Sequence, residues 1–335
     1  MSGTDDLKGL KALVTGGNGF TGSHLVRRLR EGGASVRMLA RDPAKCANSS
    51  GIGVDIVPGD IRDQAAVDRA VNGMEFVFHL AAAYRTAGLP DSDYRDIHVK
   101  GTENVLSSSL RYGVRRVVHC STVGVHGHIE RPPASEEYPF HPGDIYQVTK
   151  LEGERIAVAF GRESGLPVTI IRPCAIYGPG DLRLLKLFRI ASGRIKWLLG
   201  DGRNFYHMVY VDDLCEAFLL SAIRENVAGE TFIIGGKEVL SLDQLVDLIA
   251  DELGAPGRIV HLPAAPVQVL ATLCERMCEP FHIAPPIYRR RVDFFTKSRS
   301  FDIRRATTLL GYAPAVGIRE GVRRTADWYR KKGLL

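Results

Sequence analysis

Hydrophobic residues follow two different rhythms along the first half of the chain. Continuous apolar runs, beginning with Ala12-Leu13-Val14, are typical of strands buried on both faces. Between them lie stretches with apolar residues three and four positions apart, as in Ser23–Leu29, which predict amphipathic helices. The alternation of the two patterns predicts βαβ units and therefore a parallel sheet covered by helices.

The first strand and the first helix are joined by a glycine-rich turn. Gly16, Gly19 and Gly22 have no Cβ, so the turn is able to be tight, a pyrophosphate to approach the backbone, and the helix to pack closely on the strand. The amides at the helix start would then face the phosphates. Strand, turn, helix and a second strand, Ser35 to Ala40, follow in the order that a dinucleotide-binding site requires.

Further elements continue the alternation. Asp63 is expected to cap a helix that runs to about Asn72. The other expected elements of this half are the strands Val54–Ile61, Phe76–Leu80 and Arg116–Cys120, and helices from Asp96 to Tyr112 and from near Ile145. We therefore predict an α/β protein with a doubly wound Rossmann sheet.

The second half is less regular. Ser241 and Gln244 have the spacing of a capping box at a helix start. The other predicted elements are helices over Arg183–Arg194, Asp212–Arg224, Pro263–Phe281 and Ile318–Lys332, and a strand over Thr231–Ile234. We expect residues 1–178 to form the dinucleotide-binding domain, with a later strand and helix near 205–235 returning to it. Residues 179–335 should form mainly a smaller substrate-binding portion. In this position the helix Pro263–Phe281 would cover the substrate cleft; a core-packing or lid helix is favoured over one that, with Arg289–Arg291, touches a membrane surface.

Composition narrows the class of protein. The 335 residues include 45% hydrophobic ones, and the formal net charge is +6. The basic residues are scattered and no recognition motif accompanies them, so no nucleic-acid partner is expected. The six cysteines have neither zinc-site nor disulfide spacing, which favours a reducing compartment and no metal. Without an apolar N-terminal stretch or an apolar run long enough to span a membrane, we expect a cytoplasmic protein.

In a dinucleotide-binding fold, the residue at the end of the second strand distinguishes NAD from NADP. An acidic residue there would accept hydrogen bonds from ribose hydroxyls, whereas an arginine is able to bind a 2′-phosphate through two hydrogen bonds. Ala40 occupies the strand end and Arg41 follows, so Arg41, assisted by Arg37 or Lys45, favours NADP. Asp42 keeps NAD as the second choice, and Arg41 as a plain surface residue is an alternative of similar weight.

Two later strand ends have residues suited to the same ligand. Asp60 and Ile61 follow the third strand and are expected to border the adenine. The fourth strand ends at Leu80, and the small residues Ala81 and Ala82 leave room for a ligand, although tight packing explains them equally well.

Tyr146 and Lys150 lie four residues apart and therefore on one face of the helix that begins near Ile145. A phenol with a pKa of about 10 is a poor acid-base catalyst at neutral pH. A nearby ammonium group stabilises the phenolate and lowers that pKa, and the same lysine is able to bind a ribose hydroxyl. A hydroxyl at the end of the preceding strand, Ser121 or Thr122, makes the combination a specific signal.

These residues resemble the extended short-chain dehydrogenase/reductase family, also described as NAD-dependent epimerases and dehydratases. The family's TGxxGxxG turn corresponds to Thr15–Gly22, and its YxxxK helix to Tyr146–Lys150. Further similar stretches are Gly59–Asp63, His79–Ala82, Val99–Thr102, Arg172–Gly180, Tyr210–Leu214 and Leu310–Pro314. Within the family, these motifs are most similar to those of hydroxysteroid dehydrogenases and dihydroflavonol reductases.

The resemblance implies a role for each matching residue. Tyr146 would be the proton donor or acceptor, Lys150 its electrostatic and ribose-binding partner, and Thr122 the group that polarises the substrate, with Ser121 in reserve. It also implies a homodimer that packs through the Tyr146 helix and the Asp96–Tyr112 helix. The cofactor-binding set is then Gly16, Gly19, Phe20, Thr21, Gly22, Arg41, Lys45, Asp60, Ile61, Leu80, Ala81, Ala82, Tyr146, Lys150, Pro173, Ala175 and Ile176.

The chain departs from the family pattern at four positions. His98 and His126 replace a usual asparagine and tyrosine, and either imidazole could serve in a buried hydrogen bond or in catalysis. Val123 and Gly124 stand where related sugar-nucleotide dehydratases carry an Asp-Glu pair, which disfavours that type of dehydration.

The sequence therefore favours an oxidoreductase that transfers a hydride between a nicotinamide and a secondary alcohol or ketone, a small-molecule substrate. A nucleotide-sugar epimerase with tightly bound cofactor is the alternative, and a non-catalytic dinucleotide sensor is a third hypothesis. Their position in the sequence suggests five further pocket residues, which are Tyr84, Arg85, Arg183, Phe205 and His207.

Overall fold

The computed structural model describes residues 7–46, 53–84, 89–278 and 295–335. Its centre is a seven-stranded parallel sheet in the order β10-β6-β5-β4-β1-β2-β3. The strands are β1 (Lys11–Thr15), β2 (Ser35–Ala40), β3 (Asp55–Pro58), β4 (Phe76–His79), β5 (Arg116–Cys120), β6 (Val168–Pro173) and β10 (Thr231–Ile234). β2 and β4 lie on opposite sides of β1, so the strand order reverses there. This is the Rossmann arrangement predicted from the alternating pattern.

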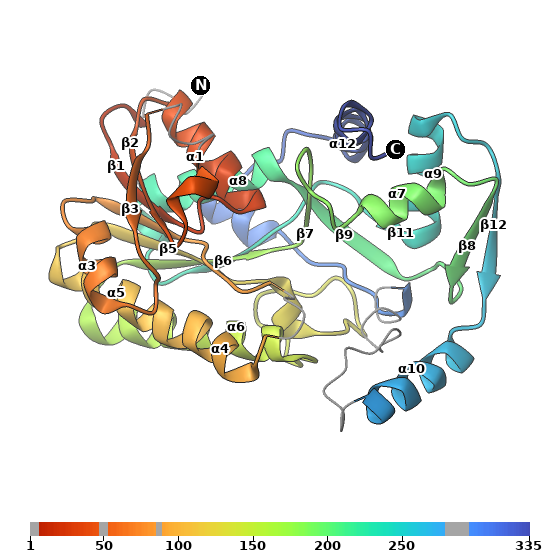
Figure 1. Ribbon diagram of the computed structural model, residues 1–335, viewed down its shortest axis with the longest axis horizontal. Helices are drawn as coiled ribbons and strands as arrows, with labels where there is room; N and C mark the ends of the chain where they lie inside the picture. The colour runs from red at the N-terminus through yellow and green to blue at the C-terminus, as the bar shows by residue number, and fades with distance from the viewer. Residues whose placement is uncertain (1–6, 47–52, 85–88, 279–294) are drawn as a thin grey trace.

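Helices cover both faces of this sheet (Figure 1). One face carries α3 (Gln64–Val71), α5 (Gly101–Arg111) and α6 (Ile145–Ser164). The other carries α1 (Phe20–Glu31) and α8 (Val211–Ile223). Because both faces are buried, the strands consist of nearly uninterrupted apolar residues, and this is why their positions were predictable within a few residues.

The helix predicted from Asp96 begins earlier. α4 (Asp91–Arg95) starts after Pro90, and acidic side chains of Asp91 and Asp93 occupy its first turn, where they complement the helix dipole. A π-helical turn over Asp96–Lys100 then links α4 to α5. Such turns are often found at functional sites, and this one directs His98 into the interior.

The second half adds two small sheets that the sequence pattern did not predict. One has the order β11-β9-β7, from β7 (Ala175–Tyr177), β9 (Phe205–Tyr210) and β11 (Val239–Ser241), and the other pairs β8 (Ile195–Leu199) with β12 (Arg258–Leu262). Their second hydrophobic core is completed by α7 (Leu185–Ala191), α9 (Leu242–Leu253) and α12 (Ile318–Lys331). The predicted capping box is present, since Gln244 N–H donates to Ser241 Oγ and the Gln244 side chain accepts from Ser241 N–H.

The predicted lid helix is wrong in its position. α10 (Ala264–Cys278) lies beside the β8–β12 pair, away from the sheet edge where the strands end (Figure 1). No residue of α10 lines the main cavity, and its Leu270 and Met277 are exposed. An apolar pattern identifies a helix but does not state which surface the helix will contact, so the sequence placed it over the cleft incorrectly.

Candidate functional site

The main cavity lies at the carboxyl ends of the parallel strands, with a volume of about 1010 Å³. Its walls come from the glycine turn after β1, the ends of β4 and β5, the first turns of α6, and the β6–β7 connection. The segment from Lys297 to Phe301 and β9 close it from the second half of the chain. In open α/β sheets this edge is where ligands bind.

Most of the predicted site residues meet at this cavity. The lining includes Gly16, Gly19, Phe20, Thr21, Gly22, Leu80, Ala82, Thr122, Tyr146, Lys150, Pro173, Ala175 and Ile176. The remaining predicted residues, Arg41, Lys45, Asp60, Ile61 and Ala81, do not line it. Among the position-based pocket residues, Tyr84, Arg183 and His207 line the cavity, Phe205 does not, and Arg85 falls outside the described residues.

The glycine turn needs its glycines because backbone segments approach closely there. A Cβ on Gly22 would stand 2.1 Å from the carbonyl oxygen of Gly16. Gly16 has a φ of +72°, and a Cβ on it would lie 2.8 Å from the amide nitrogen of Ala81. The turn therefore closes directly on the end of β4, and Ala81 lies behind it rather than in the cavity.

The predicted residues around the adenosine end are held in local contacts. Arg41 is exposed directly after the buried strand end Ala40, and Lys45 pairs with Asp42 at 3.5 Å. Asp60 pairs with Arg62 at 2.9 Å, and although partial burial raises its pKa, the hydrogen bonds from Arg62 lower it on balance. Ile61 is buried, and its side chain lies against Gly101.

Arg37 was wrongly suggested as an assistant to Arg41. It lies in the middle of β2, paired in register with Leu13 and Asp55, and not at the strand's carboxyl end. Its guanidinium pairs with Asp55 at 2.6 Å and donates to the carbonyl oxygens at the end of α3. Arg37 therefore joins strand to helix and has no access to the cavity.

The start of α6 positions Tyr146 and Lys150. Asp144 caps the helix by accepting a hydrogen bond from Gln147 N–H at 3.0 Å. The Tyr146 ring is half-buried at the cavity and meets the Tyr84 ring edge to face, with centroids 5.2 Å apart. Lys150 is buried one turn later, where its Nζ donates to the carbonyl oxygen of Cys120 at 2.5 Å. Burial lowers the pKa of Lys150, and Cys120 and Glu154 oppose that shift.

The two hydroxyls at the end of β5 have different surroundings. Ser121 is buried and donates its proton to the carboxylate of Glu154. Thr122 is half-buried at the cavity, and its Oγ1 accepts a hydrogen bond from Gly124 N–H at 3.0 Å. A hydroxyl that accepts here still carries a proton, so the Thr122 hydroxyl is able to donate a further hydrogen bond.

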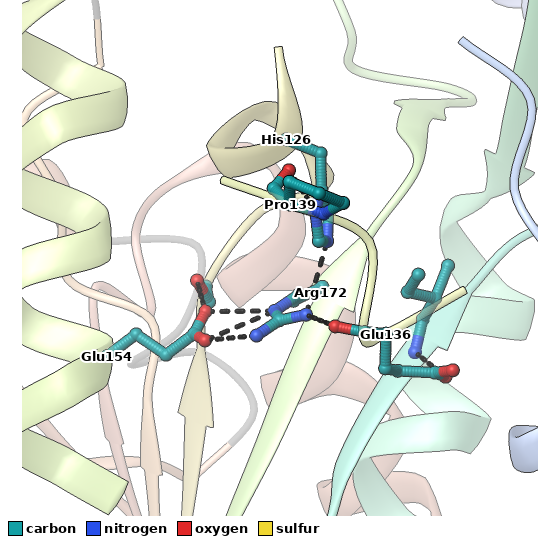
Figure 2. A network of polar contacts seen from close by, with 7 residues as sticks. His126, Glu136, Pro139, Glu154 and Arg172 are labelled. Atoms are coloured by element: carbon teal, nitrogen blue, oxygen red, sulfur yellow. Dashed lines mark hydrogen bonds and ion pairs between the residues drawn. The ribbon is translucent and has the colours of Figure 1, made fainter. Parts of the chain in front are cut away.

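A buried network of charged side chains, which the sequence did not predict, lies behind the end of β5 and the start of α6. Figure 2 shows Arg172 between Glu154, His126 and Glu136. Its guanidinium donates to Glu154 from Nη2 at 2.5 Å, to the Glu136 carbonyl oxygen at 2.8 Å, and to His126 Nε2 at 3.2 Å. Arg172 and Glu154 are 5% and 4% exposed, so the pair is desolvated. The available signal was Glu154, which lies four residues after Lys150 and so on the same helix face.

His126 and His98, the departures from the family pattern, both make buried hydrogen bonds. His126 Nε2 accepts from Arg172 and its Nδ1 faces the carbonyl oxygen of Pro139 at 3.3 Å. His98 Nε2 accepts from Ala83 N–H at 3.0 Å, and its Nδ1 lies 2.7 Å from Thr149 Oγ1. Each ring therefore uses one nitrogen as acceptor and the other as donor, which is the neutral form.

His79 belongs to the same buried layer. Its nitrogens lie 2.8 Å from Thr15 Oγ1 and 3.0 Å from Thr102 Oγ1, and Thr102 passes its own proton to the carbonyl oxygen of His98. Burial, together with the positive charge of Lys150, lowers the pKa of His79 to about 3 and that of His98 to about 2. These hydrogen bonds tie β1, β4 and the π turn together beneath the cavity.

The part of the chain that the structure describes contains no group of three or more His, Cys, Asp or Glu placed to hold a metal ion. It also has no helix of the length and apolar character needed to cross a membrane. A Rossmann sheet with a glycine turn, a strand-end hydroxyl and a Tyr-x-x-x-Lys helix at one cavity is the arrangement of extended short-chain dehydrogenases.

Comparison with known proteins agrees with this class. The sequence profile described as the NAD dependent epimerase/dehydratase family matches residues 12–235. The chain is 32% identical to 3beta-hydroxysteroid-dehydrogenase/decarboxylase isoform 2 of Arabidopsis thaliana over 94% of its length, but it spans only 61% of that relative. It is 31% identical to 2-alkyl-3-oxoalkanoate reductase of Stenotrophomonas maltophilia, over 94% of this chain and 98% of the reductase.

A solved structure gives the same result. The dTDP-glucose 4,6-dehydratase of Streptomyces venezuelae, solved with NAD and TYD bound, superposes with a TM-score of 0.74 at 30% identity, over 96% of this chain and 97% of that one. The protein belongs to the NAD-dependent epimerase/dehydratase family, and so to the extended short-chain dehydrogenase/reductases. This confirms the predicted family, the fold and an NAD(P)-dependent enzyme. The relatives agree with an oxidoreductase and also fit the epimerase alternative without favouring it.

The buried histidines predict an acid-sensitive fold. Burial lowers the pKa of His98 to about 2, whereas a histidine in the unfolded chain titrates near 6.5. Below about pH 6.5 the unfolded state therefore binds more protons, so this contribution to stability is complete above that pH and is lost as the pH falls toward the folded value. From about pH 7.5 to 5.5, one such histidine contributes about 1.4 kcal/mol to the loss of unfolding free energy.

Replacing His98 by asparagine should reduce that loss by about 1.4 kcal/mol, measured by urea denaturation at the two pH values. His128 is exposed, so His128→Gln is the matched control and should retain the wild-type loss. A His98→Asn protein with the same loss as the wild type would contradict the assignment of a neutral, buried imidazole.

Proposed function

We propose that the protein transfers a hydride between a nicotinamide cofactor and the carbon of a secondary alcohol or ketone, with Tyr146 as proton donor or acceptor. The observation that carries this proposal is the convergence of Tyr146, Lys150 and Thr122 on one cavity beside the glycine turn. A non-catalytic sensor of dinucleotides would have no use for that set.

The cofactor fits the residues present. Gly16 and Gly22 allow the turn to be tight, because a Cβ on either would meet backbone atoms, and the small residues Ala82 and Ala175 line the cavity beyond it. The turn's amides would hold the pyrophosphate, Lys150 a ribose hydroxyl, and Pro173 to Ile176 would border the nicotinamide. When bound, the cofactor supplies or accepts the hydride.

The side chains handle the oxygen and its proton. In the direction of reduction, Thr122 and Tyr146 donate hydrogen bonds to the carbonyl oxygen, and Tyr146 gives up its proton as the alcohol forms. The buried ammonium of Lys150 stabilises the phenolate that remains. In oxidation, the same phenolate takes the hydroxyl proton. Val123 and Gly124 follow Thr122 without any carboxyl group, so elimination of water has no acid or base there.

We further propose a preference for NADP(H). Arg41 is exposed immediately after the end of β2, in reach of solvent and of a 2′-phosphate on the adenosine ribose. The competing acid, Asp42, already accepts a hydrogen bond from Ala44 N–H and pairs with Lys45. Asp60 is likewise paired with Arg62, so neither carboxylate is poised to accept from ribose hydroxyls.

The dimer implied by the family resemblance is also part of the proposal. α5 and α6 pack side by side on one face of the sheet (Figure 1). Leu110 and Tyr112 at the end of α5, and Val158 on α6, are 44%, 38% and 44% exposed. We propose that these apolar side chains pack against their counterparts in a second copy of the chain.

Tyr146→Phe should reduce turnover by at least about 100-fold, because general acid-base catalysis contributes on the order of that factor or more. The cofactor dissociation constant should stay within about two-fold, since the ring and Lys150 remain. NADPH oxidation with a panel of ketones, without prior cofactor loading, measures the first quantity and also separates a reductase from an epimerase. Tyr112→Phe is the control, because it removes a phenol hydroxyl that does not line the cavity and keeps the ring proposed to pack in the dimer. Unchanged turnover in Tyr146→Phe would overturn the proposed function.

Arg41→Ala should weaken NADPH binding by about 10- to 100-fold and leave NADH binding nearly unchanged, because a charge-assisted hydrogen bond to phosphate is lost. Fluorescence titration of each cofactor gives both dissociation constants. Lys45→Ala, which removes a neighbouring cation already paired with Asp42, is the comparison variant. Equal affinities for the two cofactors in the wild type, unaltered in Arg41→Ala, would show that Arg41 is a surface residue.

Val158→Asp should convert the dimer to monomers, because a carboxylate would then be buried without a partner in the interface. Light scattering coupled to size-exclusion chromatography measures the mass. Val269→Asp is the matched control, since Val269 is an exposed valine of α10, on the opposite part of the molecule, and its substitution should leave the mass unchanged. A monomeric wild type, or a dimer that survives Val158→Asp, contradicts this interface.

A further inference from the structure

The charged side chains that line the cavity are unequal in sign. Two are acidic, Asp144 and Asp181, and four are basic, Lys150, Arg183, Lys297 and Arg299. A cavity with an excess of cations attracts anions, and its low-dielectric walls strengthen the attraction. Two of these cations, Arg183 and Lys150, already contact oxygen atoms of the protein.

Internal contacts account for the charges on the sheet side. Asp181 pairs with Arg183 at 2.6 Å, and that arginine also donates to the Ile176 carbonyl oxygen and lies over the rings of Phe20 and Tyr84. Asp144 is the cap of α6. Lys150 is committed to the Cys120 carbonyl oxygen and to the proposed catalysis.

Arg299 differs from the other cavity arginine. Its backbone is fixed beside β9, because Arg299 N–H donates to the Phe205 carbonyl oxygen at 2.8 Å and His207 N–H donates to the Arg299 carbonyl oxygen at 2.9 Å. The side chain is half-buried at the cavity, and among the described residues no carboxylate forms an ion pair with it. Lys297, two residues earlier on the same segment, lines the same wall.

We propose that Arg299 binds a carboxylate group of the substrate, so that the substrate is a hydroxy acid or oxo acid. This proposal rests on the proposed function, because it names the substrate class of that site. The planar guanidinium of an arginine matches a carboxylate through two parallel hydrogen bonds, and the backbone of Arg299 is fixed at the cavity wall. The names of two relatives, an oxoalkanoate reductase and a dehydrogenase/decarboxylase, refer to carboxylate chemistry and are consistent with it.

Oxidation of such a substrate requires only the nicotinamide and Tyr146. In oxidation of a 3-hydroxy acid, the hydrogen on the hydroxyl-bearing carbon leaves with its electron pair as hydride to the nicotinamide. The hydroxyl proton passes to Tyr146, and the C–O bond becomes a carbonyl. The carboxylate takes no part in this exchange and serves only to orient the substrate on Arg299.

The test compares a 2-alkyl-3-hydroxyalkanoate with its methyl ester, which keeps the carbon skeleton and the hydroxyl but lacks the negative charge. Wild-type kcat/KM should favour the acid. In Arg299→Gln, kcat/KM for the acid should fall by about 10- to 150-fold, mainly through KM, as expected for a lost hydrogen bond to a charged group. The ester cannot form the ion pair and should lose at most about three-fold. Arg299→Lys should restore part of the loss, and Arg194→Gln, an exposed arginine outside the cavity, is the control.

A second measurement separates this inference from the proposed chemistry. A 2-alkylalkanoate without the hydroxyl cannot react, and calorimetry should show that it binds the wild type with cofactor present and binds Arg299→Gln at least about ten-fold more weakly. Equal binding to both proteins, or equal losses for acid and ester in Arg299→Gln, would overturn the carboxylate site. Selective carboxylate binding without any turnover would support the site and overturn hydride transfer instead.

Discussion

A buried ammonium ion, that of Lys150, is the constraint around which the catalytic half of this structure is arranged. Removing a charge from water is costly, and the cost is tolerable only where hydrogen bonds and opposite charges compensate for it. Lys150 receives that compensation from the Cys120 carbonyl oxygen at the end of β5 and from Glu154 one turn along α6. The contacts that stabilise the ammonium therefore also fix α6 against the end of the sheet.

Glu154 transmits this constraint further. Its carboxylate accepts from Ser121 on β5 and from Arg172 on β6, and Arg172 donates to His126 and to the Glu136 carbonyl oxygen (Figure 2). One connected network thus spans two strands, one helix and the loop before that helix. Removing one member of a buried ion pair leaves the other uncompensated, which costs about 3–5 kcal/mol. The strand end that carries Thr122 is consequently held in place by Glu154, Arg172 and His126, which do not line the cavity.

The neutral histidines follow from the same charge. His98 replaces the family's usual asparagine, and both side chains offer one donor and one acceptor, so hydrogen bonding to Ala83 and Thr149 is possible without a charge. A second cation beside Lys150 would be repelled in this dry layer, and the pKa of His98 is lowered accordingly, first by burial and then by Lys150. His98 lies within the π turn over Asp96–Lys100, which adds a residue to the helix where His98 enters the core.

What the sequence could predict depended on whether the signal was local. The parallel strands and the Tyr146–Lys150 pair were predictable because each is a short pattern with a defined period. The small sheets of the second half were not, because strands such as β7 are three residues long and half-buried, which leaves no periodic pattern. The cavity wall formed by Lys297 and Arg299 was missed because only tertiary packing brings that segment beside β9. The role of Arg37 was also not predictable, because its pairing with Asp55 depends on the register of β2 against β3.

The two arginines of the cavity show how the same side chain takes different roles according to its partners. Arg183 forms an ion pair with Asp181, and its guanidinium lies over the rings of Phe20 and Tyr84. It therefore adds little net charge to the cavity wall. Arg299 has its backbone fixed and its guanidinium unpaired with any described carboxylate, so its charge is available to a ligand. Because the sheet side is balanced internally, the excess charge lies on the segment from the second half of the chain. In the proposed function, chemistry and recognition are therefore divided between the two halves: Tyr146 at the edge of the Rossmann sheet would handle the proton, and Arg299 from the irregular half would distinguish the substrate by its charge.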